Sequence, residues 1–135
     1  MCCRSNHPWG THPFPAEDLV TGAIQTTQRQ SETDVLLIVT DEANRIIGLH
    51  IENKVGSGKF TSAQPEMYQH RAEHWIRNAR YGNYSEFDTV LLAPVAFRSR
   101  HESQAGCFGC FIAHEEVAKF IPLFGHQGVS RTDTE

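Results

Sequence analysis

The segment from Thr33 to Lys54, TDVLLIVTDEANRIIGLHIENK, constrains the fold of this chain more than any other. It reads as two apolar strands that are rich in β-branched residues and joined by the polar turn at 41–45. The charged residues therefore lie at the outer ends of both strands, away from the turn. When the hairpin folds back on itself, Asp34 is expected beside Glu52.

Side chains alternate along a strand, so Glu52 and Lys54 share one face while Asn53 points to the other. Two carboxylates and one ammonium then converge at the mouth of an otherwise apolar sheet. Carboxylates placed this close repel each other and are costly to desolvate. A hard divalent cation with oxygen ligands would offset that cost. The alternative is an ordinary strand end, with solvated carboxylates and Lys54 paired to one of them.

The residues that follow add a second pattern. Gln64 and Tyr68, in QPEMY, stand at the expected start of a helix, and 88–94, DTVLLAP, reads as a further core strand. The order Asp34, strand, turn, strand, Glu52-x-Lys54, then Gln64-x-x-x-Tyr68 resembles the PD-(D/E)xK nuclease superfamily with its Gln-x-x-x-Tyr motif. The resemblance covers residues 31–124. It departs from the motif name at Thr33, where a proline is usual.

The resemblance implies a restriction-endonuclease-like α/β fold: a mixed central sheet flanked by helices, with a three-stranded antiparallel start and then a crossover helix. The expected strands of that start are 19–28, 33–40 and 46–51. Both faces of the central strands are apolar, which predicts a sheet covered on both sides. The superfamily core usually begins with a helix, and the first 17 residues do not have a helical pattern.

The resemblance also implies a function and a site. The expected activity is hydrolysis of phosphodiester bonds by a metal-activated water, with DNA as the substrate and RNA as the second candidate. Asp34, Glu52 and the backbone carbonyl of Asn53 would bind Mg²⁺ or Mn²⁺, and Lys54 would position the attacking water. Three residues on one line of the helix, Gln64, Tyr68 and Arg71, would contact the nucleic acid.

Two other functions remain open. The chain could be a catalytically weak or inactive member of the same fold that binds nucleic acid or protein. It could also be a small zinc domain, since Cys107-x-x-Cys110 has the spacing of half a zinc site, although Cys2-Cys3 lacks ligand spacing. His50 shares the face of Glu52, and a hydrogen-bonded strand residue is the favoured interpretation of it.

Length and composition set the outer limits. The 135 residues predict one domain, with an irregular segment at 1–17 that contains three prolines, a nuclease-like domain at 18–124 and a tail at 125–135. The formal charge of −4 predicts that any nucleic-acid site depends on a local basic patch. No apolar run is long enough for a membrane span, and no signal peptide is recognisable, so a cytoplasmic protein is expected. A homodimer is compatible with the pattern.

Overall fold

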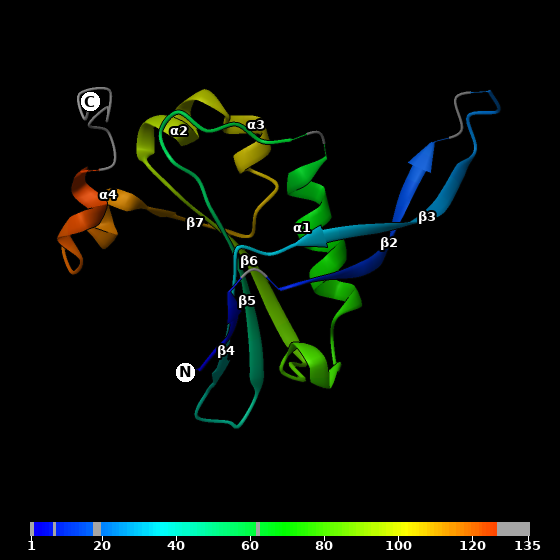
Figure 1. The fold of residues 1–135 in the computed structure, drawn as a ribbon, viewed down its shortest axis with the longest axis horizontal. Helices are drawn as coiled ribbons and strands as arrows, with labels where there is room; N and C mark the ends of the chain where they lie inside the picture. Colours follow the sequence, from blue (N-terminus) through cyan, green and yellow to red (C-terminus); the bar gives the residue numbers. More distant parts are fainter. Residues whose placement is uncertain (1, 7, 18–19, 62, 127–135) are drawn as a thin grey trace, which may run out of the picture.

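The structure is a computed structural model that describes residues 2–6, 8–17, 20–61 and 63–126. Its centre is a five-stranded sheet in the order β1-β4-β5-β6-β7 (Figure 1). The strands are β1 (Cys2–Asn6), β4 (Val35–Thr40), β5 (Ile46–Asn53), β6 (Glu86–Ala93) and β7 (Cys110–Ala113).

The sheet is mixed. β1, β4 and β5 are antiparallel, and β6 and β7 continue parallel to β5. Helix α1 (Gln64–His74) makes the crossover from β5 to β6, as a parallel pair requires. The prediction of an α/β fold with an antiparallel three-stranded start and a crossover helix is therefore confirmed at this level. The prediction for its first strand was wrong, because β1 from the N-terminus pairs with β4 in the position expected for 19–28.

The predicted first strand belongs to a separate two-stranded ribbon instead. β2 (Trp9–Glu17) pairs antiparallel with β3 (Ile24–Glu32), and the ribbon lies on the α1 side of the sheet (Figure 1). The prediction that 1–17 is irregular was therefore also wrong. Pro13 and Pro15 are tolerated in β2 because each strand of a two-stranded ribbon has one unpaired edge, where a missing N–H costs nothing.

Short helices surround the end of the sheet where β5 and β6 finish. Pro94 ends the pairing of β6 and begins α2 (Val95–Arg100), which α3 (Glu102–Ala105) follows. Much of the polar segment 98–106 is therefore helical. α4 (His114–Val117) and the 3-10 turn η2 (Pro122–His126) follow β7, and α4 lies on the side of the sheet opposite α1 (Figure 1).

The core lies between the sheet and α1. One cluster packs Leu36 of β4 against three aromatic residues, Trp75, Tyr81 and Tyr84. Gly48 of β5 makes room for Tyr84, since a Cβ there would lie 2.6 Å from the ring. A second cluster joins α1 to β6, α2 and α3 through Tyr68, Leu91, Ala93, Phe97, Ala105 and Phe108.

The opposite face of the sheet is covered less completely. Its β4 and β5 residues are only partly buried, although the apolar pattern predicted cover on both sides; they are Val35, Leu37, Val39, Ile47, Leu49 and Ile51. Within the described ranges, no helix has the length and hydropathy needed to cross a membrane. Most of the predicted tail, 127–135, lies outside the described residues, while Gly125 and His126 belong to η2.

Candidate active site

The ends of β4 and β5 bring the predicted carboxylates together. Val35 pairs with Ile51, so the preceding Asp34 and the following Glu52 lie across from each other. Asp34 accepts a hydrogen bond at Oδ2 from the backbone N–H of Asn53, at 3.0 Å. The expected convergence of the two strand ends is therefore observed.

Glu52 is the best enclosed of these groups, with 3% of its surface exposed. Its Oε1 accepts from Lys54 Nζ and from Gln64 Nε2, both at 2.9 Å. Its Oε2 accepts from the Tyr68 hydroxyl. Burial raises the pKa of Glu52, and Asp34 raises it further, whereas the bonds from Tyr68 and Lys54 lower it. The donors thus counteract the desolvation of the carboxylate.

Lys54 is held as tightly as its partner. Its Nζ donates to Glu52 Oε1 at 2.9 Å, to Gln64 Oε1 at 3.1 Å and to the Lys59 carbonyl at 2.8 Å. An ammonium has three N–H donors, so these acceptors use its full capacity. A water molecule can reach Lys54 only by replacing one of them.

Gln64 and Tyr68 both form hydrogen bonds with this pair of charges. They lie one turn apart at the start of α1, which directs both side chains toward the end of β5. The Gln64 amide bridges Glu52 and Lys54, and the Tyr68 hydroxyl also accepts from the backbone N–H of Asp34 at 3.1 Å. Tyr68 is 1% exposed, so the expected contact with nucleic acid does not fit its position.

Arg71 was expected to contact the substrate, and the structure places it inside the protein instead. Its side chain is buried, its guanidinium lies 4.2 Å from the centre of the Tyr68 ring, and Nε donates to Thr33 Oγ1 at 2.8 Å. Burial lowers the pKa of Arg71, while the charges of Glu52 and Asp34 raise it. The site thus contains two carboxylates and two cations, so its formal charges balance.

A buried chain of hydrogen bonds continues from Arg71 beneath the site. Thr33 Oγ1 lies 2.9 Å from His50 Nδ1, and His50 Nε2 lies 3.0 Å from the Tyr84 hydroxyl. Tyr84 donates its proton to the carbonyl of Ala72. His50 Nε2 must therefore carry the proton given to Tyr84, and Thr33 must donate to Nδ1.

This assignment requires a neutral His50. Burial lowers the pKa of His50 to about 3, which agrees with that requirement. The interpretation of His50 as a hydrogen-bonded strand residue is confirmed. Sequence reasoning missed Thr33 and Tyr84 as members of this network, because their contacts join positions far apart in the chain.

His114 at the start of α4 was also missed. Its side chain is buried, and its Nε2 lies 2.8 Å from Asn53 Oδ1. An amide oxygen can only accept, so Nε2 carries the proton. Asn53 is thereby fixed through its side chain to His114 and through its backbone to Asp34. No local signal marks a residue 61 positions from its partner.

Asp34 and Glu52 carry the oxygen ligands that a hard divalent cation would require. Asp34 is close enough that its charge raises the pKa of Glu52, and both side chains offer carboxylate oxygens. Glu52 Oε1 already receives two donors, but Oε2 receives one and keeps a second lone pair. Within the described residues, no group of three or more His, Cys, Asp or Glu side chains is arranged for a metal. A cation here would need the Asn53 carbonyl or solvent in addition.

Comparison of the chain with known protein families, curated proteins and solved structures found no match.

Proposed function

We propose that this chain is a metal-dependent nuclease of the PD-(D/E)xK type, with a restriction-endonuclease-like fold, that hydrolyses phosphodiester bonds in DNA. The observation that carries the proposal is the hydrogen-bonded group of Asp34, Glu52, Lys54, Gln64 and Tyr68 at the ends of β4 and β5. The motif residues thus occupy one site in the order that the sequence resemblance implies. The mixed sheet and the α1 crossover support the same assignment.

Asp34, Glu52 Oε2 and the Asn53 carbonyl would hold Mg²⁺ or Mn²⁺. Such a cation supplies an activated water and offsets the negative charge that develops on the phosphate. Both carboxylates must be ionised for this role. The bonds from Tyr68 and Lys54 to Glu52 favour its ionised form against the effect of burial.

Lys54 would orient the attacking water. Because its three donors are occupied, one acceptor must leave first, and the Lys59 carbonyl is the best candidate. Glu52 and Gln64 are held by further hydrogen bonds, whereas Lys59 is exposed and lies in the segment 55–59, which contains two glycines. Release of this contact would give Lys54 a donor for the water without disturbing the carboxylate.

The test is cleavage of single- and double-stranded DNA by the purified protein with Mg²⁺ or Mn²⁺, beside EDTA. We expect metal-dependent cleavage that is lost in Lys54→Ala. Lys119→Ala is the matched control, since Lys119 is an exposed lysine paired only to Glu116 on α4 in the described contacts. Retention of full activity in Lys54→Ala would exclude the proposed role of Lys54.

A second candidate function is a binding module of the same fold without catalysis. The observation that favours it is the balance of formal charges in the site, where all three donors of Lys54 are paired, so that no cation is needed to offset the charge. Calorimetric titration with Mn²⁺ separates the two candidates. If the protein is a nuclease, the wild type should bind Mn²⁺ and the Asp34→Ala variant should not. If it is a pure binding module, the wild type should bind nucleic acid and no ion.

A further inference from the structure

Three exposed cations lie on the segment that leaves the candidate active site and on the helix beside it. Lys59 belongs to the loop 55–60, and Arg98 and Arg100 belong to α2. The loop is tied to the site by Lys54, which donates to the Lys59 carbonyl at 2.8 Å. A turn from Gly58 N–H to the Val55 carbonyl, at 2.9 Å, shapes the loop between them.

α2 packs directly on this loop. Phe97 and Phe60 meet edge to face, with ring centres 5.3 Å apart, and the Arg100 guanidinium donates to the Gly56 carbonyl. Gly56 is two residues beyond Lys54, and two residues span at most about 7 Å. Arg100 therefore reaches the backbone next to the proposed catalytic lysine.

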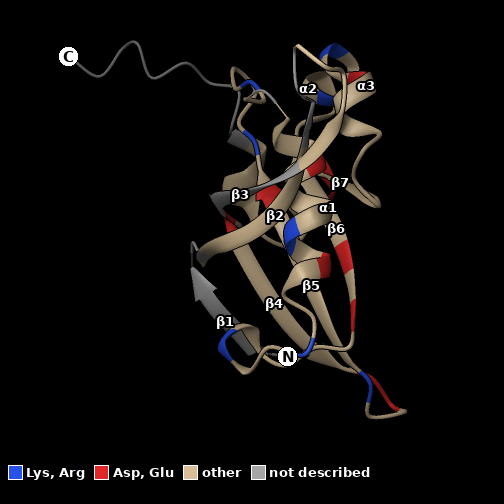
Figure 2. Ribbon diagram, turned by 90° about the vertical axis from the view of Figure 1, so that its right-hand side faces the viewer, with Lys and Arg blue, Asp and Glu red and all other residues tan. Residues whose placement is uncertain are grey.

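Carboxylates border this surface, and two of them have partners of their own. The Glu115 carboxylate accepts from the Val95 N–H, at 3.2 Å to each oxygen, and Glu116 pairs with Lys119 at 3.0 Å. α3 begins with the exposed Glu102, which confines the basic surface to the loop and α2. Figure 2 shows the basic residues of α2 at the end of the molecule opposite the charged turn at 41–45.

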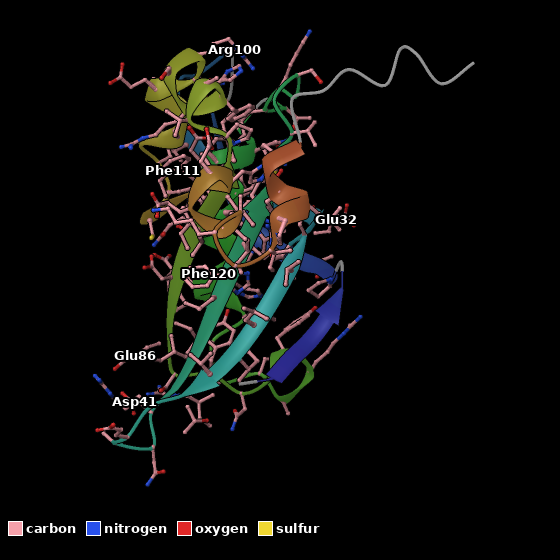
Figure 3. The ribbon with its side chains drawn as sticks, turned by 90° about the vertical axis from the view of Figure 1, so that its left-hand side faces the viewer. Glu32, Asp41, Glu86, Arg100, Phe111 and Phe120 are labelled. Carbon is pink, nitrogen blue, oxygen red and sulfur yellow. The ribbon has the colours of Figure 1, made fainter. Side chains whose placement is uncertain are left out.

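Figure 3 shows the same separation, with Arg100 at one end of the sheet and Asp41 and Glu86 at the other. Arg98 lies with its guanidinium 4.8 Å from the centre of the Phe111 ring, which holds it on the surface of β7. A strand of DNA advances about 3.4 Å per phosphate along its axis. A strand cleaved at Lys54 would thus pass Arg100 within a few nucleotides.

We propose that Lys59, Arg98 and Arg100, here named the basic rim, bind the backbone phosphates of a DNA strand beside the cleavage site. This inference rests on the proposed function and adds where its substrate lies. Arg100 would exchange the neutral Gly56 carbonyl for a phosphate oxygen, since an arginine bonds an anionic oxygen more strongly than a neutral one. The exchange would also release the loop whose Lys59 carbonyl occupies Lys54.

The experiment is DNA binding by fluorescence anisotropy in EDTA, where cleavage does not interfere, with Arg100→Gln beside Arg45→Gln. Arg45 is an exposed arginine at the far end of the sheet, paired with Asp41 at 2.6 Å, so the control makes the same change of charge away from the rim. Loss of one phosphate contact makes the slope of log K against log salt less negative by about 0.9. The wild-type advantage over Arg100→Gln should therefore shrink by about 3.5-fold between 50 and 200 mM salt.

The expected result is weaker binding and a shallower salt slope in Arg100→Gln, with Arg45→Gln equal to the wild type. Equal slopes in all three proteins, or the same loss in Arg45→Gln, would overturn the basic rim. Absence of DNA binding by the wild type would overturn it too. Parallel cleavage assays with Mg²⁺ separate the two proposals, because cleavage without an Arg100 effect refutes only the rim, and an Arg100 effect without cleavage refutes only the nuclease.

Discussion

Replacement of Thr33 by valine tests the buried network that supports the candidate site. Valine keeps the shape of threonine and removes its hydroxyl, which accepts from Arg71 Nε at 2.8 Å and lies 2.9 Å from His50 Nδ1. Both partners are buried, so each loses a hydrogen bond without gaining water. A buried neutral group left unpaired costs about 1–3 kcal/mol, and a charged one more. We expect the free energy of unfolding to fall by about 3 kcal/mol.

Urea unfolding followed by circular dichroism measures this loss. With a slope of about 1.5 kcal/mol per molar urea, the midpoint should fall by about 2 M. Thr40→Val is the matched control, because Thr40 is exposed at the end of β4 and should change stability by less than about 0.5 kcal/mol. A loss in Thr33→Val no larger than that of the control would refute the hydrogen-bond chain through His50.

Three further predictions concern Glu52, Tyr68 and Gly82. Burial raises the pKa of Glu52 above its ordinary value of 4.5, so the native state binds this proton more tightly than the unfolded chain does. The stability of the wild type relative to Glu52→Gln should therefore fall as the pH rises from 4.5 through the folded pKa. Urea unfolding at several pH values measures the difference in stability, and a constant difference would contradict the prediction. Tyr68→Phe removes a bond that lowers the pKa of Glu52, so the acid limb of the pH–rate profile for DNA cleavage should move to higher pH, and an unshifted limb would argue against it. Gly82→Ala should lower the free energy of unfolding by about 2 kcal/mol or more, because Gly82 has φ +87° and a Cβ would lie 2.5 Å from Ile38 Cγ1. Gly106→Ala is the control, since a Cβ there would make ordinary contacts. Equal urea midpoints for the two variants would contradict this prediction.

The hairpin and its charged ends could be predicted from the sequence because the information is local. β-branched strands, a polar turn and the spacing of Asp34, Glu52 and Lys54 together specify the register. The connection from β5 to α1 is also short, so the sequence predicts Gln64 and Tyr68 at the start of the helix that follows Lys54. Gln64 and Tyr68 lie 12 and 16 positions from Glu52.

The rest depends on contacts that no local pattern encodes. β1 pairs with β4 across more than 25 residues, and the prolines of β2 suggested coil because its unpaired edge could not be foreseen. The prediction that the Arg71 side chain contacts the substrate was wrong for a similar reason. Its place on the helical line of Gln64 and Tyr68 predicts a shared face, but the chain position does not show the buried hydroxyl of Thr33, 38 positions away, to which its Nε donates.

The most direct test of the proposed nuclease is DNA cleavage by Asp34→Asn in the presence of Mg²⁺. Asparagine keeps the size of the side chain and an oxygen that can accept from the Asn53 N–H, so the fold should be preserved while the charge needed for a cation is lost. Asp41→Asn, in the exposed turn, is the control. The account predicts metal-dependent cleavage in the wild type and the control, and none in Asp34→Asn. Undiminished cleavage in Asp34→Asn, or no cleavage in the wild type, would contradict it.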